Sequence, residues 1–172
     1  MVQHKPLSRN ETGFTIPELI IVIMVSLVLL SIAVPAVNSI MDHYRVVLTA
    51  QTIASQLQFA RMKSVASNES FRVNFPAGQR LYRVEDSSGN VIAGPFYLPK
   101  GVDWNSVDSG SGITFQGNYV SFTPTGNIPT SGNGSAGRAK IINQSQVRVD
   151  IVVSSGGVIR QTPAYKTATA PF

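Results

Sequence analysis

An uncharged, apolar stretch near the N-terminus limits what this chain can fold into more than any other feature. No charged side chain occurs from Leu19 to Met41, a run of 23 residues dominated by Leu, Ile, Val and Ala. A helix of about 20 apolar residues is long enough to cross the hydrocarbon core of a bilayer. The run is therefore predicted to be a membrane-spanning helix, and the length of 172 residues leaves room for one further domain after it.

One carboxylate stands at the start of this apolar helix. Glu18 immediately precedes the uncharged run. An ionisable group in such a place is costly unless it finds a partner, so Glu18 is a functional candidate. The alternative is a plain signal anchor, in which Glu18 lies at the membrane edge and extends toward water.

The segment before the apolar run, Met1 to Gly13, is polar and has no apolar core. A secretory signal peptide carries its hydrophobic region before the cleavage site, so this segment is of a different kind. Lys5 and Arg9 lie on its side of the run. The positive-inside tendency then favours a cytoplasmic leader and an exported C-terminal domain.

The start of the run resembles a known processing signal. Gly13-Phe14-Thr15, then Glu18 as the fifth residue counted from Phe14, then a long apolar run, is similar to the class III signal of type IV pilins and type II secretion pseudopilins. The resemblance implies that prepilin peptidase, a membrane aspartic peptidase, cuts between Gly13 and Phe14 and methylates the new amine. It also implies that Glu18 pairs in the filament with the amine of Phe14 on a neighbouring subunit.

The helix is predicted to continue beyond the membrane. Apolar residues recur there at helical spacing, which is typical of an amphipathic helix with one face toward a core: Val46, Val47, Ala50, Ile53, Ala54, Leu57 and Ala60. We expect one helix from about Thr15 to about Ala66. Pro35 removes a backbone hydrogen bond within it and favours a kink. The resemblance implies that the helix loosens at Pro35 in the assembled filament, although membrane helices also tolerate proline without such a role.

From Ser70 the periodicity changes to that of short strands separated by Gly- and Pro-rich turns. We expect strands at 71–75, 80–85, 91–98, 113–115, 119–123, 147–154 and 158–162, loops at 103–112 and 126–137, and a tail with little pattern at 163–172. The predicted class is α+β and pilin-like: a long N-terminal hydrophobic helix continues into an amphipathic helix packed on an antiparallel β-sheet domain. The expected divisions are a cleaved leader at 1–13, the hydrophobic transmembrane or filament-core helix at 14–41, its amphipathic continuation at 42–66, and an exported β-rich domain at 67–172.

Two further stretches resemble the GspH/FimT group of minor pseudopilins. They are Ala60-Arg61, followed by Ser64 and Ala66, and the run from Phe122 to Gly126, which reads FTPTG. Pilus-associated members of that group often carry a cysteine pair, whereas this chain has no cysteine. Some FimT-like members end with a Gly-Arg-x-Arg motif used for DNA. The corresponding place here is Gly157-Val158-Ile159-Arg160, which lacks one of the two arginines.

Positive charge gathers toward the C-terminus of a chain whose net charge is +5. From Gly137 onward one acid, Asp150, stands against five cations: Arg138, Lys140, Arg148, Arg160 and Lys166. Two interpretations stay open. The cations are either solvated charges that keep the domain soluble or a phosphate-binding stripe, with Arg160 across the Gly156-Gly157 hairpin from Arg148.

The sequence gives little support for catalysis. The chain has no cysteine, which excludes thiol catalysis. Its only histidines are His4, in the expected leader, and His43, so a histidine-rich metal site is also excluded. Asp103, Asn105 and Asp108 suggest a calcium loop, but Val107 stands where an oxygen ligand is wanted, so a solvated loop is expected. We expect no enzymatic activity and no cofactor.

These features predict a minor pilin or pseudopilin, a structural subunit that is cut after Gly13 and lifted into a filament at or near its tip. The filament is a type IV pilus or a type II secretion pseudopilus. The expected location is the bacterial inner membrane, single-pass with the C-terminal domain in the periplasm. Expected partners are prepilin peptidase, other pilin or pseudopilin subunits, the inner-membrane assembly platform, and membrane lipid before assembly. The alternative is a DNA-binding minor pilin of a DNA-uptake pilus, with the C-terminal cations as its site.

Overall fold

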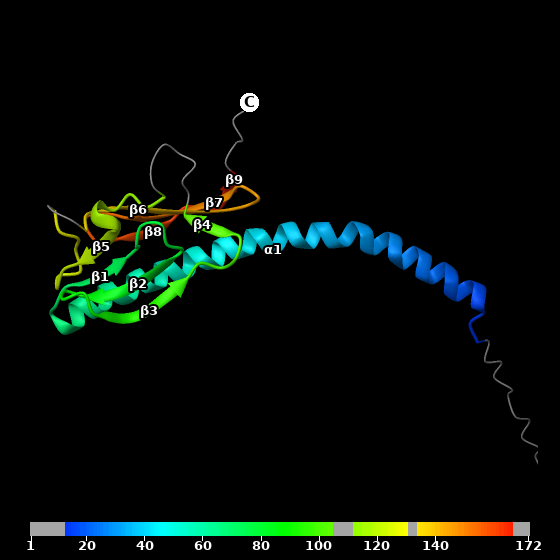
Figure 1. Cartoon of the computed structure of the whole chain (residues 1–172), viewed down its shortest axis with the longest axis horizontal. Helices are drawn as coiled ribbons and strands as arrows, with labels where there is room; N and C mark the ends of the chain where they lie inside the picture. Colours follow the sequence, from blue (N-terminus) through cyan, green and yellow to red (C-terminus); the bar gives the residue numbers. More distant parts are fainter. Residues whose placement is uncertain (1–12, 105–111, 131–133, 167–172) are drawn as a thin grey trace, which may run out of the picture. The chain divides into compact units, whose positions relative to one another are not determined.

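The computed structural model of the chain describes residues 13–104, 112–130 and 134–166, apart from the side chains at 35, 36, 38 and 39 (Figure 1). The described residues form one long helix, α1 (Ile16–Ser67), and two antiparallel sheets. The helix bounds differ by one residue at each end from the predicted ones. The chain divides into two compact units, Met1–Asn38 and Ser39–Phe172, and α1 contributes to both.

In the first unit, α1 is apolar on every side. The stretch Ile16–Val34 has a mean hydropathy of 2.6 with none of it buried, and it is long and apolar enough to cross a membrane. Its two serine hydroxyls bond to the helix itself, Ser26 to the carbonyl of Val22 and Ser31 to that of Val28, each at 2.7 Å. These bonds satisfy the hydroxyls without water, as a surrounding of hydrocarbon requires.

In the second unit, α1 is amphipathic, as predicted. Its fully or almost fully buried side chains recur every three or four residues: Val46, Ala50, Ile53, Ala54, Leu57 and Ala60. Residues between them, such as Gln51, Ser55 and Gln58, are exposed. The buried face joins side chains of both sheets in one hydrophobic cluster, so the helix and the sheets share a core.

Two sheets accompany this part of the helix (Figure 1). The first has the order β3-β2-β1-β5, formed by β1 (Phe71–Asn74), β2 (Leu81–Asp86), β3 (Val91–Tyr97) and β5 (Tyr119–Phe122), and a short 3-10 helix (Gln116–Asn118) precedes β5. The second has the order β4-β6-β7-β8, formed by β4 (Val102–Trp104), β6 (Gly137–Asn143), β7 (Val147–Val153) and β8 (Ile159–Gln161). The short strand β9 (Tyr165–Lys166) also pairs with β7.

The structure corrects the strand predictions in four places. β6 was not expected, β4 extends into the predicted loop at 103–112, and β9 lies in the tail that showed little pattern. The stretch 113–115 forms only a single bridge, between Ile113 and Ala139. β6 reads GRAKIIN, and its first four residues lack the β-branched side chains that favour strands. It is a strand because β4 and β7 pair with it on either side.

Several aromatic rings pack against one another around Phe75, which follows β1. The ring of Phe75 stacks on Phe115 at 5.5 Å and meets Trp104 edge-on at 5.5 Å. Tyr82 lies beside Phe75 at 6.1 Å, and burial raises the pKa of Tyr82 to about 12. Trp104 is the only tryptophan in the chain, so its fluorescence reports on this core.

Candidate functional site

The predicted cleavage point lies immediately before α1. The helix begins at Ile16, and the amide of Leu19 donates to the carbonyl of Thr15 at 3.2 Å. Pro17 falls in the first turn, where its missing N–H is not needed. Gly13 and Phe14 therefore precede the helix, and Phe14 is 81% exposed.

Among the described residues, no contact requires glycine at position 13. A Cβ atom added to Gly13 would meet no atom within 4 Å, and its backbone is not in the left-handed region. The contrast with Gly157 is large, because a Cβ there would lie 2.1 Å from the carbonyl oxygen of Gly126. The described part of the chain therefore gives no reason for glycine at position 13, and prepilin peptidase as its source stays a prediction.

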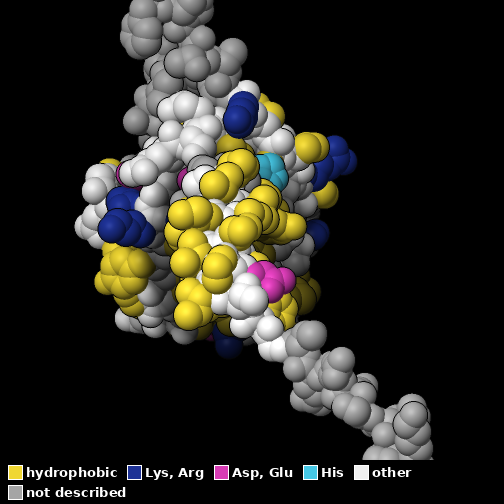
Figure 2. All heavy atoms as spheres, turned by 90° about the vertical axis from the view of Figure 1, so that its right-hand side faces the viewer, with side chains coloured by type: hydrophobic (Ala, Val, Ile, Leu, Met, Phe, Trp, Pro, Cys, Tyr) yellow, Lys and Arg dark blue, Asp and Glu magenta, His cyan; other side chains and the backbone are white. Residues whose placement is uncertain are grey.

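Glu18 lies in the first turn of α1, where the helix dipole favours a negative charge. Within the described part of the chain, Glu18 forms no ion pair. It is surrounded along the helix by exposed apolar side chains, including Ile16, Leu19 and Ile21. Figure 2 shows hydrophobic side chains gathered on the face of the molecule that is turned to the viewer. A carboxylate among apolar side chains is costly without a partner, and the pairing of Glu18 with a neighbouring subunit stays a prediction.

Pro35 lies inside α1, and the backbone is helical on both sides of it. The loosening of the helix at Pro35 in a filament stays a prediction.

The five C-terminal cations lie on four strands of the second sheet. Arg138 and Lys140 are on β6, Arg148 is on β7, Arg160 is on β8 and Lys166 is on β9. The predicted placement of Arg160 opposite Arg148 is wrong. The hairpin at Gly156-Gly157 pairs Val153 with Ile159, so Arg160 lies opposite Val152, and Arg148 lies opposite Tyr165.

Arg148 is held by a partner of its own. Its side chain is buried, with Nε donating to Oδ1 of Asp150 at 2.8 Å and Nη2 donating to Oδ2 at 3.1 Å. The guanidinium also lies 5.6 Å from the ring centre of Tyr165. Arg138 approaches the same carboxylate at 4.0 Å. Two-point pairing of this kind fixes the arginine in place. Arg138, Arg160 and Lys166 are the exposed members of the set.

Three sequence stretches that are far apart in the chain meet at one point of the second unit. Nε of Arg61, on α1, donates to the carbonyl of Gly126 at 2.9 Å. Gly157, in the β7–β8 turn, approaches that same carbonyl so closely that a side chain would not fit. Gly126 and Gly157 both have positive φ, at 76° and 70°. We call these three residues the glycine lock. The glycine lock brings one residue from each of the Ala60-Arg61, FTPTG and Gly156-Gly157 stretches into contact.

Comparison with protein families identifies the group. Residues 49–157, more than half of the chain, match the family model described as type II transport protein GspH. The chain belongs to the GspH family. The match confirms the resemblance to the GspH group of the pilin and pseudopilin superfamily. A comparison with curated proteins gives no match.

Solved structures with the same fold include two such proteins. The type IV minor pilin FimU of Pseudomonas aeruginosa is similar with a TM-score of 0.53 and 13% identity, over 76% of this chain and 99% of that chain. The minor pseudopilin EpsH from the Type 2 Secretion System of Vibrio cholerae has a TM-score of 0.50 and 12% identity, over 69% of this chain and 96% of that chain. At these identities the likeness shows the fold alone, and it confirms the pilin-like α+β architecture.

The GspH match and the N-terminal signal are separate observations. The match begins at Thr49 and ends at Gly157, so it includes all three residues of the glycine lock. It excludes Gly13, Phe14, Glu18 and Pro35, and it also stops short of Arg160 and Lys166. The two lines of evidence therefore rest on different residues of this GspH-family chain.

The loop that was predicted to be solvated rather than to bind calcium lies partly outside the described residues. Asp103 lies 3.5 Å from Nε of Arg80, while Asn105 and Asp108 lie outside the described residues. Among the residues that the structure describes, no group of three or more His, Cys, Asp or Glu could hold a metal ion. His43 is exposed and meets the ring of Tyr44 edge-on at 6.5 Å.

Proposed function

We propose that this GspH-family chain is a minor pilin or pseudopilin, a structural subunit and not an enzyme. Prepilin peptidase cuts it between Gly13 and Phe14 and methylates the amine of Phe14. Before assembly it spans the bacterial inner membrane once, with the β-rich domain in the periplasm. The assembly platform then lifts it into a type IV pilus or type II secretion pseudopilus, near the tip.

The observation that carries this proposal is the state of α1 in its first unit. This 19-residue, predominantly apolar stretch of helix is not covered by any described part of the chain, so it needs a surrounding that other molecules supply. Lipid supplies that surrounding before assembly, and the helices of neighbouring pilin or pseudopilin subunits supply it afterwards. Because lipid tails and protein side chains are similarly apolar, the hydrophobic effect scarcely distinguishes the two surroundings.

Polar groups must therefore direct the transfer from lipid to filament. The new amine of Phe14 and the carboxylate of Glu18 are the charges available at this end of the mature chain. Opposite charges about 4 Å apart attract by about 4 kcal/mol at an effective dielectric constant near 20, against about 1 kcal/mol in water. Desolvation removes part of that gain, so the pair sets the register of a subunit more than it adds stability.

Replacement of Gly13 tests the processing step. Gly13→Val places a branched side chain at the scissile bond, and its Cβ atom would meet no described atom of the chain within 4 Å. We expect the leader to stay attached when the variant is co-expressed with prepilin peptidase, as measured by mass spectrometry of membranes. Thr15→Val serves as a matched change two residues away that leaves the scissile pair intact. Efficient cutting of the Gly13 variant would contradict the proposal.

A DNA-binding minor pilin is the second candidate. The exposure of Arg138, Arg160 and Lys166 favours it, whereas the pairing of Arg148 with Asp150 removes one cation from the stripe. Each phosphate contact contributes a log–log salt slope of about −0.9, so three contacts give a slope no steeper than about −3. Titration of the full chain in detergent with duplex DNA at two salt concentrations tests this. Binding that is lost in Arg160→Ala/Lys166→Ala supports DNA uptake, and no binding at low salt rejects it.

A further inference from the structure

The end of the second unit at which α1 enters it carries an unusual set of side chains. Three of the five tyrosines of the chain are exposed: Tyr44, Tyr97 and Tyr165. Each is followed closely in the sequence by a cation, Arg45 on α1, Lys100 after β3 and Lys166 on β9. We call these six residues the collar.

Contacts within the second unit bring the collar together. Arg45, Tyr97 and Pro99 line one groove of about 300 Å³ between α1 and the first sheet. Arg45 and Lys100 line the next hollow, together with Asp42 and Gln144. Arg80 holds the loop that carries Lys100, because its Nη2 donates to the carbonyl of Pro99 at 3.0 Å.

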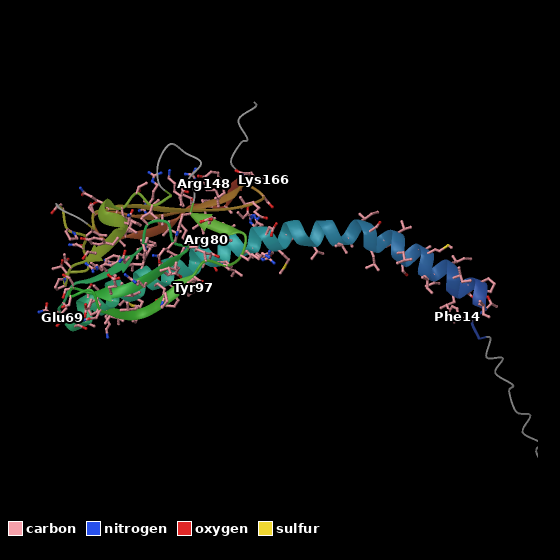
Figure 3. All side chains as sticks on the ribbon, viewed as in Figure 1. Phe14, Glu69, Arg80, Tyr97, Arg148 and Lys166 are labelled. Atoms are coloured by element: carbon pink, nitrogen blue, oxygen red, sulfur yellow. The ribbon has the colours of Figure 1, made fainter. Side chains whose placement is uncertain are left out.

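The second sheet supplies the other side of the collar. The side-chain amide of Asn143 donates to the backbone carbonyl of Asp42 at 3.0 Å, and the hydroxyl of Ser145 donates to the carboxylate of Asp42 at 3.1 Å. Val147 follows this turn and pairs with Lys166, which places β9 at the same end. Figure 3 shows Tyr97 and Lys166 coming from the two sheets, on opposite sides of α1.

Charge is left over in this region. Asp42 pairs with Arg45 at 3.1 Å, and Asp103 pairs with Arg80 at 3.5 Å. Among the described residues, no acid lies within ion-pairing distance of Lys100 or Lys166. The two ion pairs are neutral, so the net charge of +2 at this end comes from Lys100 and Lys166, which are available to an anion.

The collar residues on α1 follow the predicted membrane-spanning run closely in the sequence. That uncharged run ends at Met41, and Tyr44 and Arg45 are three and four residues further along the helix. Three or four helical residues rise about 5 to 6 Å. The headgroup region of a bilayer adds roughly 5 to 8 Å on each side of the hydrocarbon core. Tyrosine is enriched at that depth, and lysine near it is attracted to anionic lipid.

We propose that the collar contacts the phosphate headgroups of anionic phospholipids while α1 is inserted in the bilayer. The tyrosines place their rings at the level of the headgroups, and Lys100 and Lys166 meet the phosphates. The contact orients the β-rich unit on the membrane surface before the subunit enters a filament. This inference rests on the proposed membrane insertion of α1.

The test uses the full chain reconstituted in vesicles. Because the chain has no cysteine, a single introduced cysteine takes a fluorescent label alone. Gln144→Cys places the label beside Lys100, and Ser67→Cys places it at the other end of α1, 25 helical residues or about 38 Å from Asp42. Vesicles of phosphatidylcholine, alone or mixed with phosphatidylglycerol, carry a small fraction of lipid with a nitroxide quencher on its headgroup.

We expect the Gln144 label to be quenched more strongly than the Ser67 label, and only when phosphatidylglycerol is present. Salt should relieve the quenching, because it screens exposed charges. Lys100→Gln/Lys166→Gln should shift the equilibrium between bound and free collar about 25-fold toward the free state, at about fivefold for each lysine. Lys63→Gln/Lys140→Gln removes the same charge elsewhere and should leave the quenching unchanged.

Three outcomes would overturn the proposal. They are equal quenching at both labels, quenching that ignores lipid charge, and quenching that depends on the protein-to-lipid ratio. The last would mean that a neighbouring copy of the chain covers the collar. Flotation of the vesicles in a density gradient separates this result from the proposed anchor. Loss of flotation in the unsubstituted chain would refute membrane insertion, whereas normal flotation without headgroup contact would refute the collar alone.

Discussion

Within one helix, α1, apolar side chains meet two different surroundings. Between Ile16 and Val34 they cover all sides and none is buried by the chain itself. Between Val46 and Ala60 they occupy one face and are buried against two sheets, while the opposite face is polar. Helical propensity and apolar content therefore do not decide which face of a helix is buried by its own chain. That is decided by how the apolar residues are distributed around the helix axis.

The largest expected effect comes from truncating one leucine in each half. Leu57 is 0% exposed, and Leu57→Ala should lower the free energy of unfolding of the second unit by about 2 to 5 kcal/mol. Leu27 is 61% exposed, and Leu27→Ala should change the free energy of unfolding of the second unit by less than about 0.5 kcal/mol. Denaturant unfolding of the full chain in detergent, followed by the fluorescence of Trp104, measures both. Equal losses would show that the two halves do not differ as described.

The next effect concerns the glycine lock, which fixes the helix of the second unit to the β7–β8 turn. Gly157→Ala would place a Cβ atom 2.1 Å from the carbonyl oxygen of Gly126 and strain a positive φ. We expect a loss of about 2 to 3 kcal/mol. Gly156→Ala is the control, since a Cβ there would meet nothing within 4 Å. The same unfolding experiment applies, and an unchanged midpoint for the Gly157 variant would rule out the lock.

A smaller effect is expected from Glu18, and on assembly only. Glu18→Ala should be cleaved and inserted normally but enter filaments about tenfold less well, which corresponds to about 1.4 kcal/mol. That is the part of the pairing energy that we expect to survive desolvation. Glu69→Ala removes an exposed carboxylate from the second unit and should have no effect. Immunoblotting of sheared filaments against membranes measures the ratio, and normal incorporation of the Glu18 variant would remove that residue from the mechanism.

The smallest effect is a pH dependence confined to the second unit. Burial by itself raises the pKa of the Glu85 carboxyl. This effect is outweighed by hydrogen bonds from Asn74, Arg72 and Arg83 and by the charge of Arg72, so the pKa lies below the ordinary value of 4.5. A carboxyl with a lowered pKa in the folded state stabilises the fold above about pH 4.5, and this contribution is lost as the pH falls through the folded-state pKa.

The loss should be small because the side chains of Arg72 and Arg83 are 30% and 38% exposed, so that water solvates them when Glu85 is protonated. Unfolding midpoints measured by the fluorescence of Trp104 between neutral and acid pH give the slope. Glu85→Gln should flatten the acid limb of the curve, whereas Glu69→Gln should leave it as it is. An acid limb that persists in Glu85→Gln would assign the dependence to another group.

Local periodicity was sufficient to predict much of this protein. It gave both ends of α1 to within one residue, because helix formation depends on contacts three and four residues apart. It also placed β1, β2, β5 and β7 to within one residue at each end. β1 and β5 bury alternate side chains, as expected of half-buried strands, whereas β7 is buried along almost its whole length. The processing signal at Gly13, Phe14 and Glu18 is likewise a local pattern, and its role stays a prediction.

Pairing across the sheets could not be predicted in this way. Lys140 faces Asp150, and Arg148 faces Ile142 and Tyr165, only because β6 and β9 lie beside β7. The glycine lock joins Arg61 to Gly126 and Gly157, which are 65 and 96 residues further along the chain. The collar likewise takes its lysines from two distant segments, the loop after β3 and strand β9. Such contacts are decided by which surfaces can be buried together, and that depends on the whole folded unit rather than on any neighbouring residues in the sequence.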